Sequence, residues 1–173
     1  MVIEKGRLSD LDELEVLYNS LNDHFESGIN YPGWIKHIYP VRDTAQEGID
    51  SGNLFVLKVN GVIVGSIILN HEPEKAYEEV EWGTGVPYSN VFVIHTLVVH
   101  PAFFKKGIGK QLMDFARNYA EIQNIKSIRL DVAENNFPAI SLYEKCGYKY
   151  IGTVDLGLDY AHLKWFRLYE LLL

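Results

Sequence analysis

The stretch VFVIHTLVVHPAFFKKGIGKQLM, which runs from Val91 to Met113, decides the fold of this chain. Its first nine residues form an almost unbroken apolar run, which is typical of a strand buried on both faces. The strand ends at His100-Pro101, because proline lacks the N–H group that a central ladder needs. Gly107 and Gly109 follow, and a pattern with helical period starts beside them. A strand, a glycine-rich turn and the start of a helix gather backbone N–H groups around an anion, so the stretch predicts an anion-binding site.

The composition is that of an ordinary globular domain, with 47% hydrophobic and 23% charged residues. A length of 173 residues predicts one domain over 1–173. No window approaches the roughly 18 uninterrupted apolar residues of a membrane span, so no membrane partner is expected. The N-terminus lacks the apolar core of a signal peptide and the single cysteine, Cys146, cannot form an intrachain disulfide, which together favour a cytoplasmic protein. The net charge of −7 argues against nucleic acid as the main partner.

Hydrophobic periodicity and turn signals predict the elements outside this stretch. The pair Asn60-Gly61 is the strongest hairpin signal in the chain. The predicted strands are Val2–Lys5, Leu54–Val59, Val62–Leu69, the strand from Val91, Ser127–Val132, Tyr148–Val154 and Leu163–Leu171. The predicted helices begin after Ser9 or Asp10, near Val41, after Gly107 and at Pro138, and a short one lies within His71–Glu81. The strand–helix–strand order from Val91 to Val132 implies a right-handed parallel crossover, so we expect an α+β domain with a mixed sheet.

Two blocks in this order resemble the GNAT superfamily of N-acetyltransferases, which transfer an acetyl group from acetyl-CoA to an amine. HTLVVHPAFFKKGIGKQLM is similar to the family's acetyl-CoA signature, and NFPAISLYEKCGYK is similar to its Asn…Ala…Leu-Tyr-Glu-Lys…Gly-Phe/Tyr helix. Together the blocks cover roughly Val91 to Tyr150. The resemblance implies a GNAT-like fold, a central mixed, mostly antiparallel sheet of about seven strands flanked by about four helices.

The resemblance identifies the anion as the pyrophosphate of coenzyme A. Backbone amides at the helix start are expected to bind it, and glycines there let the backbone approach without a Cβ in the way. The implied cofactor-binding residues of the turn are Lys105, Lys106, Gly107, Ile108, Gly109 and Lys110. The chain departs from the signature at Phe104, where the family usually has Gln or Arg three residues before the first glycine. Phosphate binding is therefore expected to rest on the amides and the adjacent lysines.

The strand before the turn and the later helix are expected to act on the thioester. By resemblance, Leu97, Val98 and Val99 pair with the pantetheine, and the N–H of Leu97 or Val98 donates to the thioester oxygen. Tyr143 matches the family tyrosine that protonates the CoA thiolate, and a phenol of pKa ~10 keeps its proton at neutral pH. A tyrosine that only packs in the core is the alternative. Asn136 matches the family asparagine that bonds the pantetheine, although an ordinary helix N-cap has the same sequence.

The base that removes the acceptor's proton has two candidates. An amine of pKa ~10 is almost wholly protonated at pH 7, so a proton must leave before attack. His95 lies on the central strand, in a segment that resembles arylalkylamine acetyltransferases, where histidines help to remove the proton. Those enzymes have a second histidine where this chain has Val93, and a hydrogen-bonded interior histidine is the alternative for His95. Glu81, at the end of an acidic run, is the second candidate.

The acceptor is expected to be a primary amine of a small molecule or a peptide. Tyr31, Trp34 and Tyr160 are the predicted substrate-binding residues, since loop aromatics often line a pocket, here one for an apolar or aromatic amine. A hydrophobic flap over the core is the alternative. The glutamates within His71–Glu81 favour instead a polyamine or a lysine side chain, or form only a solvated surface.

Direct transfer in a ternary complex is preferred to a covalent route, because Cys146 lies at a helix end with no histidine in its motif. The six histidines show no metal-ligand spacing such as HxxxH, so no metal is expected. An acyl-CoA-binding sensor that keeps the fold without catalysis is the alternative function. A homodimer formed through the late strands and a monomer are both compatible with the resemblance.

Overall fold

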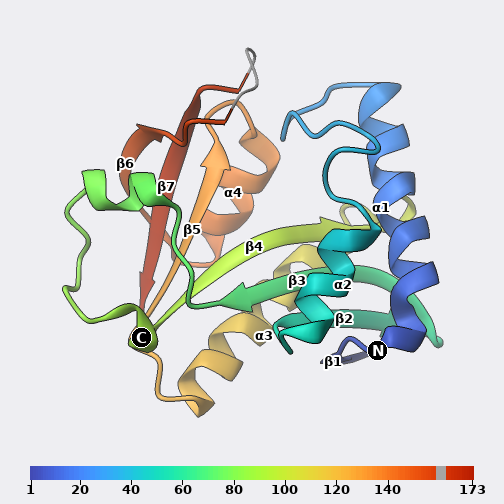
Figure 1. Cartoon of the computed structure of the whole chain (residues 1–173), viewed down its shortest axis with the longest axis horizontal. Helices are drawn as coiled ribbons and strands as arrows, with labels where there is room; N and C mark the ends of the chain where they lie inside the picture. Colours follow the sequence, from blue (N-terminus) through green and yellow to red (C-terminus); the bar gives the residue numbers. More distant parts are fainter. Residues whose placement is uncertain (159–162) are drawn as a thin grey trace. The chain divides into compact units, whose positions relative to one another are not determined.

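The computed structural model describes residues 1–158 and 163–173, which form seven strands and four α-helices (Figure 1). The strands are β1 (Val2–Lys5), β2 (Leu54–Val59), β3 (Val62–Asn70), β4 (Val91–Val99), β5 (Ser127–Ala133), β6 (Lys149–Asp155) and β7 (Trp165–Leu172). The α-helices are α1 (Leu11–Glu26), α2 (Arg42–Asp50), α3 (Ile108–Ile122) and α4 (Phe137–Lys145). Short 3₁₀ turns lie at η1 (Leu8–Asp10), η2 (Lys75–Glu79), η3 (Tyr88–Asn90) and η4 (Pro101–Phe103). Each predicted strand and helix is present, with ends that differ by a residue or two.

The strands follow the hydrogen-bonding order β1-β2-β3-β4-β5-β7-β6. β4 runs parallel to β5, with Val91 opposite Ser127 and Ile94 opposite Leu130. The pairs β1–β2, β2–β3, β5–β7 and β6–β7 are antiparallel. The predicted α+β fold with a mixed, mostly antiparallel sheet is therefore confirmed.

The contacts within the chain divide it into two compact units. Unit 1 comprises Met1–Asn30, Trp34–Leu69 and His95–Phe115. Unit 2 comprises Tyr31–Gly33, Asn70–Ile94 and the described part of Ala116–Leu173. The boundaries after Leu69, Ile94 and Phe115 fall within β3, β4 and α3, respectively, and a single domain over 1–173 stays a prediction.

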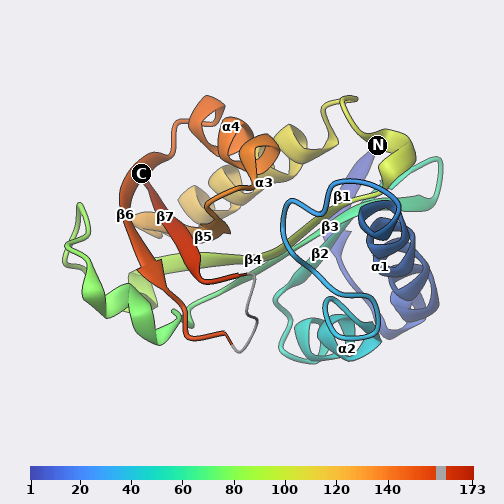
Figure 2. The same ribbon diagram turned by 90° about the horizontal axis from the view of Figure 1, so that it is seen from above.

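In unit 1, α1 and α2 lie over the same face of β2 and β3 (Figure 2). α1 forms because leucines recur along one side at helical spacing. The leucines of this side pack with residues of β2 and β3 in the core of the unit. They are Leu11, Leu14, Leu17 and Leu21. The β2–β3 hairpin turns at Asn60 and Gly61, whose φ angles of 52° and 83° confirm the predicted tight turn.

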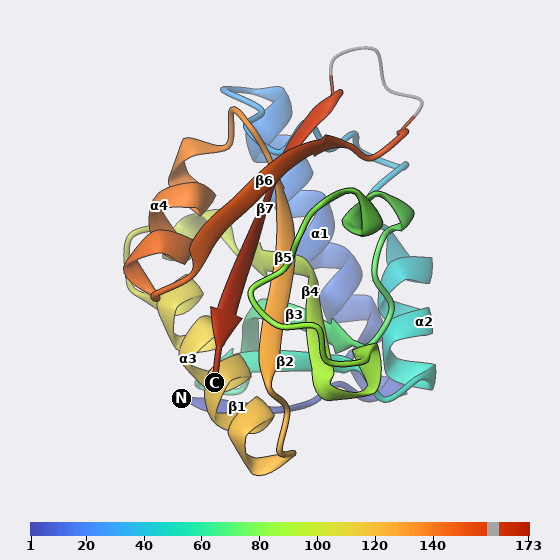
Figure 3. The same ribbon diagram turned by 90° about the vertical axis from the view of Figure 1, so that its left-hand side faces the viewer.

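In unit 2, α4 lies on one face of β5, β7 and β6, and the segment from Asn70 to Asn90 lies on the other (Figure 3). Adjacent residues of β7 show both contacts. The Tyr169 hydroxyl donates to Glu144 Oε1 of α4 at 3.0 Å, while Leu168 packs in the cluster that contains Tyr77 of η2. Within the described ranges, no helix of either unit is long and apolar enough to cross a membrane.

Candidate active site

β4 carries an irregularity directly before Leu97, the first of its predicted pantetheine-pairing residues. Thr96 has a φ of +47°, and the parallel register with β5 ends two residues earlier, at the Ile94–Leu130 pair. After the irregularity, Val98 is buried, whereas Leu97 and Val99 are half-buried. Side chains alternate strictly only along extended backbone. The predicted pantetheine-pairing residues therefore come directly after a local bend in β4, which interrupts the regular alternation of the strand.

The turn between β4 and α3 bends through left-handed backbone. Lys105 has a φ of +59° and Gly107 a φ of +81°. A Cβ added to Gly107 would meet no atom closer than Gln111 Nε2 at 4.0 Å, so conformation and not space requires this glycine. The N–H of Gln111 donates to Gly107 O at 3.1 Å and closes the first turn of α3. The N–H groups of a helix's first turn have no acceptor within the helix, so this turn presents donors to an anion.

Lysines occupy the exposed part of the turn, at Lys105 and Lys106, and Lys110 is exposed in the first turn of α3. Lys106 Nζ lies 4.9 Å from the centre of the Phe103 ring, and Lys110 Nζ lies 2.5 Å from Asp114 Oδ2. Phe104, the departure from the family signature, packs edge-on against the His24 ring of α1 with the ring centres 5.2 Å apart. Phe104 thus contacts α1 within unit 1, and phosphate binding by the turn's amides and lysines stays a prediction.

α4 of unit 2 carries the two residues that matched the second family block. Asn136 is the N-cap, and its Oδ1 accepts the N–H of Ala139 at 3.3 Å. Tyr143 lies on the buried side of the helix, 6% exposed, with the Tyr148 and Tyr169 rings centred 6.2 and 6.5 Å away. Burial of the phenol raises the pKa of Tyr143 well above the ordinary tyrosine value, and the negative charge of Asp131 raises it further. Tyr143 therefore holds its proton firmly.

Asp131 of β5 is a carboxylate that interacts with Tyr77 and Tyr143 and that the sequence interpretation did not single out. Its Oδ2 accepts the hydroxyl proton of Tyr77 at 2.8 Å, and its charge acts on both Tyr77 and Tyr143. Burial and this carboxylate raise the pKa of Tyr77 well above its ordinary value. The signal in the sequence is a carboxylate within the mostly buried run SIRLDVA, which ends at Ala133, three residues before Asn136 of the second block.

The two base candidates occupy different settings. His95 of unit 1 is half-buried on β4, directly before the left-handed Thr96. Glu81 of unit 2 is exposed and follows η2, beside Trp82, whose indole N–H donates to Tyr77 O at 2.9 Å. Each role stays a prediction.

The predicted acceptor aromatics fall into separate groups. Trp34 of unit 1 is half-buried between Phe25 and Tyr39, with edge-on ring contacts at 6.4 and 5.6 Å. Tyr31 is half-buried in unit 2. Tyr160 lies outside the described residues. The structure thus brings Trp34 together with two aromatic rings that the sequence did not assign to the site.

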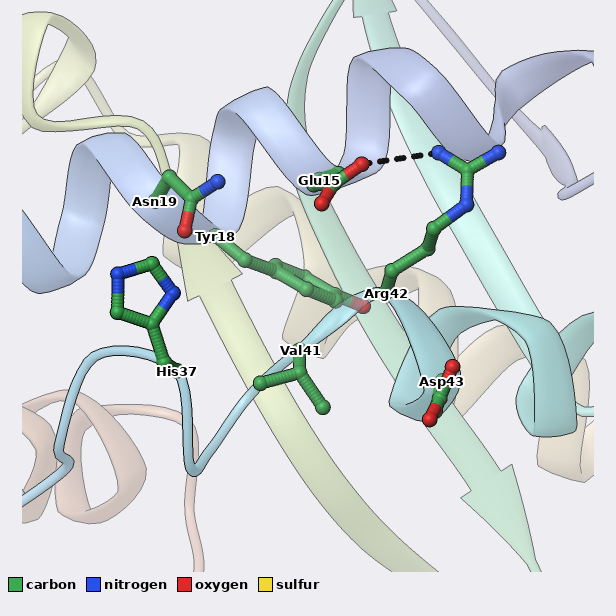
Figure 4. A pocket seen from close by; sticks show the side chains of 7 residues that line it. All are labelled: Glu15, Tyr18, Asn19, His37, Val41, Arg42 and Asp43. Atoms are coloured by element: carbon green, nitrogen blue, oxygen red, sulfur yellow. Dashed lines mark hydrogen bonds and ion pairs between the residues drawn. The ribbon is translucent and has the colours of Figure 1, made fainter.

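A cavity of about 230 Å³ lies in unit 1 between α1, α2 and the segment that joins them (Figure 4). An ion pair between Arg42 and Glu15 crosses one side of it at 2.9 Å. The residues that line it are Glu15, Tyr18, Asn19, His37, Val41, Arg42 and Asp43. This cavity holds none of the residues predicted from the sequence. Across residues 1–158 and 163–173, no three histidine, cysteine or carboxylate side chains are grouped as metal ligands.

Comparison with known proteins gives matches for most of the chain. The family model described as acetyltransferase (GNAT) family matches residues 14–148. A streptothricin acetyltransferase of Escherichia coli is 35% identical over 69 residues, 40% of this chain and 39% of that protein. The UPF0157 protein YqkA of Bacillus subtilis is 41% identical over 81 residues, 44% of this chain and 23% of that protein. The chain thus spans between about a quarter and two fifths of the length of these curated relatives.

Solved structures match over nearly the whole chain. The GNAT-family acetyltransferase of Streptococcus agalactiae superposes with a TM-score of 0.80, over 99% of this chain and 95% of that one, at 18% identity. At this identity the likeness establishes the fold and no more.

Proposed function

The chain belongs to the acetyltransferase (GNAT) family, and we propose that it transfers an acetyl group from acetyl-CoA to a primary amine of a small molecule or peptide, by direct attack in a ternary complex. The single observation that carries this proposal is the turn after β4. It joins left-handed backbone at Gly107, exposed lysines and the start of α3, which is the arrangement that binds a phosphate group.

The turn fits coenzyme A. Open space faces Gly107 where a side chain would otherwise stand, so a phosphate can approach the backbone closely. Lys105 and Lys106 are exposed beside it and add positive charge. When bound, acetyl-CoA supplies the activated acetyl group. Residues Lys105 to Lys110 hold its pyrophosphate in this proposal, and Asn136 binds its pantetheine through the side-chain N–H₂ group, because Oδ1 caps α4.

Two groups of the chain act on the thioester in this proposal. The N–H of Leu97 or Val98 donates to the carbonyl oxygen, a contact worth about 3 kcal/mol of barrier in comparable sites. Tyr143 donates the proton that the departing thiolate needs. Its raised pKa keeps the phenol protonated throughout the neutral range, so the proton is present for transfer, and the same shift makes the phenol a weaker acid.

The acceptor's proton needs a base or a water chain that leads to solvent. His95 and Glu81 remain the proposed bases. The structure adds Asp131, a carboxylate hydrogen-bonded to Tyr77 and close enough to Tyr143 to shift its pKa. A carboxylate also attracts the cationic form of an amine. Asp131 is therefore the third group whose removal tests deprotonation.

A panel of amines tests the proposal by measuring release of the CoA thiol. Aromatic amines, polyamines, aminoglycoside-like amines and peptide N-termini represent the acceptor classes. Release that depends on an amine, and that Tyr143→Phe slows, is the expected result. Acetyl-CoA binding without thiol release in any class indicates the acyl-CoA-binding sensor, and absence of acetyl-CoA binding overturns both functions.

A further inference from the structure

Thr96 adopts a backbone conformation that its side chain disfavours. Its φ is +47°, and a β-branched residue at positive φ is an outlier because Cβ crowds the neighbouring carbonyl. The residue is also 7% exposed and lies inside a strand. Such a conformation persists only where surrounding contacts hold it in place. The contacts of Thr96 therefore indicate what keeps β4 bent.

Tyr39 provides such a contact from the segment that joins α1 and α2. Its hydroxyl hydrogen-bonds Thr96 Oγ1. The backbone of Tyr39 is held in turn by the Asn22 side chain, whose Nδ2 donates to Tyr39 O at 3.4 Å and to Pro40 O at 3.5 Å. The Trp34 ring packs edge-on against the Tyr39 ring at 5.6 Å. All these residues belong to unit 1. The contacts of Asn22 and Trp34 thus hold Tyr39 in the position from which its hydroxyl contacts Thr96 at the bend in β4.

The orientation of the amides after Thr96 depends on its backbone angles, because a peptide plane is fixed by the dihedral angles on either side of it. We propose that Tyr39 is a positioning residue that holds Thr96 left-handed, so that the N–H groups of Leu97 and Val98 keep the direction needed to bind the thioester oxygen. The inference rests on the proposed function. By this inference, the segment between α1 and α2 helps to position the acetyl donor, acetyl-CoA. The role predicted for Trp34 in the same segment concerns the amine acceptor.

Three substitutions separate positioning from simple packing. Tyr39→Phe and Thr96→Val each remove the hydroxyl contact and keep the shape, so each lowers kcat about 10- to 100-fold with little change in the KM for acetyl-CoA. Thr96→Gly adopts positive φ without any contact to hold it. In the Thr96→Gly background, Tyr39→Phe therefore lowers kcat less than about twofold, the scatter expected of independent sites.

An infrared measurement tests the same point without turnover. Acetyl-CoA labelled with ¹³C at its carbonyl is bound to the protein with no amine present, and the carbonyl band is compared with that in solution. A hydrogen-bonded carbonyl absorbs at lower frequency. The wild type is expected to lower the frequency, Tyr39→Phe and Thr96→Val to lose most of the shift, and Tyr39→Phe/Thr96→Gly to recover it.

The pair Tyr150–Thr153 in unit 2 is a matched control, since the two hydroxyls hydrogen-bond at 2.9 Å and Thr153 is not left-handed. Tyr150→Phe is expected to leave kcat and the carbonyl band unchanged. A wild-type band that does not shift overturns the proposed amide contact itself. The positioning role is overturned if Tyr39→Phe and Thr96→Val keep the wild-type band shift. It is also overturned if Tyr39→Phe lowers kcat by the same factor in the wild type and in the Thr96→Gly background. Either outcome leaves the proposed function intact.

Discussion

The two units use the same pair of chemical groups in opposite surroundings. In unit 2, Arg129 Nε lies 3.0 Å from Glu170 Oε1, and the two side chains are 3% and 2% exposed. In unit 1, Arg42 pairs with Asp12 at 2.6 Å and with Glu15 at 2.9 Å, and its side chain is 41% exposed. Distance does not distinguish the two clusters. Burial does, because a charge removed from water depends entirely on its protein partners.

The buried cluster also fixes a loop, which the exposed one does not. Glu170 Oε2 accepts the N–H of Gly83 at 2.7 Å, and Arg129 donates to Thr84 O at 2.7 Å. The guanidinium group stacks over the rings of Trp82 and Tyr88, 4.3 and 5.1 Å from their centres. A buried ion pair thus holds the segment that follows Glu81, the candidate base, against β5 and β7. The candidate groups differ in the same way, since Tyr143 is buried in unit 2 while the turn at Gly107 is exposed in unit 1.

The largest effect is expected from Glu170→Ala. The substitution leaves Arg129 buried without its carboxylate and removes the acceptor of the Gly83 N–H, so the free energy of unfolding falls by about 3–5 kcal/mol. Urea denaturation measures the loss. The double substitution Arg129→Met/Glu170→Leu is the control, because it removes both charges and is expected to recover most of the stability. A double variant as unstable as Glu170→Ala would show that the lost hydrogen bonds to Gly83 and Thr84, not an unpaired charge, cause the effect.

Tyr143→Phe tests the buried group that is proposed to act in catalysis. Removal of a general acid lowers kcat by at least about 10²-fold, close to 2.7 kcal/mol of barrier, while stability and the KM for acetyl-CoA change little. Tyr148→Phe is a matched control. Its ring is the neighbour of Tyr143, it is 3% exposed, and its hydroxyl has no hydrogen-bond partner among the described residues. Equal losses of kcat in the two variants would contradict the role of Tyr143.

The raised pKa of Tyr143 leads to a prediction for how stability and the reaction rate depend on pH. Its pKa is raised in the folded chain, so the native state favours the protonated phenol. Its contribution to stability is therefore fully present below the unfolded pKa of ~10 and is lost as the pH rises through the higher folded value. Between pH 6 and 9 the wild-type rate should show no alkaline limb from this group. A limb in that range that Tyr143→Phe abolishes would contradict the raised pKa.

The sequence predicts the backbone groups of the site better than the side-chain contacts. The turn at Gly107 and the hairpin at Asn60-Gly61 could be predicted because local residues specify their conformation. The bend at Thr96 could not, since threonine does not favour positive φ and its Tyr39 partner is 57 residues away in sequence. Asp131 and the Arg129–Glu170 pair were missed for the same reason. Their contacts join distant strands and loops, and no short motif carries them.

Gly107→Ala tests the exposed turn. Alanine disfavours a φ of +81°, so the free energy of unfolding falls by about 1–2 kcal/mol and the altered turn binds acetyl-CoA more weakly. Gly61→Ala is the control, because Gly61 has a φ of +83° with no atom within 4 Å of the added Cβ. The two variants should lose similar stability in urea. Only Gly107→Ala should raise the Kd for acetyl-CoA in calorimetry, and an unchanged Kd would remove the turn from the cofactor site.

The smallest effect is expected from Arg42→Ala, which completes the comparison with Arg129. Asp12 and Glu15 raise the pKa of Arg42 above its ordinary value through hydrogen bonds, but water screens the charges and can replace the lost partner. The melting temperature should therefore shift by less than about 2 °C, and added salt should remove that shift. Both carboxylates stay solvated in the variant, unlike Arg129 when Glu170 is removed. A larger shift that persists in salt would mean that the Arg42 stem, which lines the cavity of unit 1, stabilises α1 and α2 by packing and not by its charge.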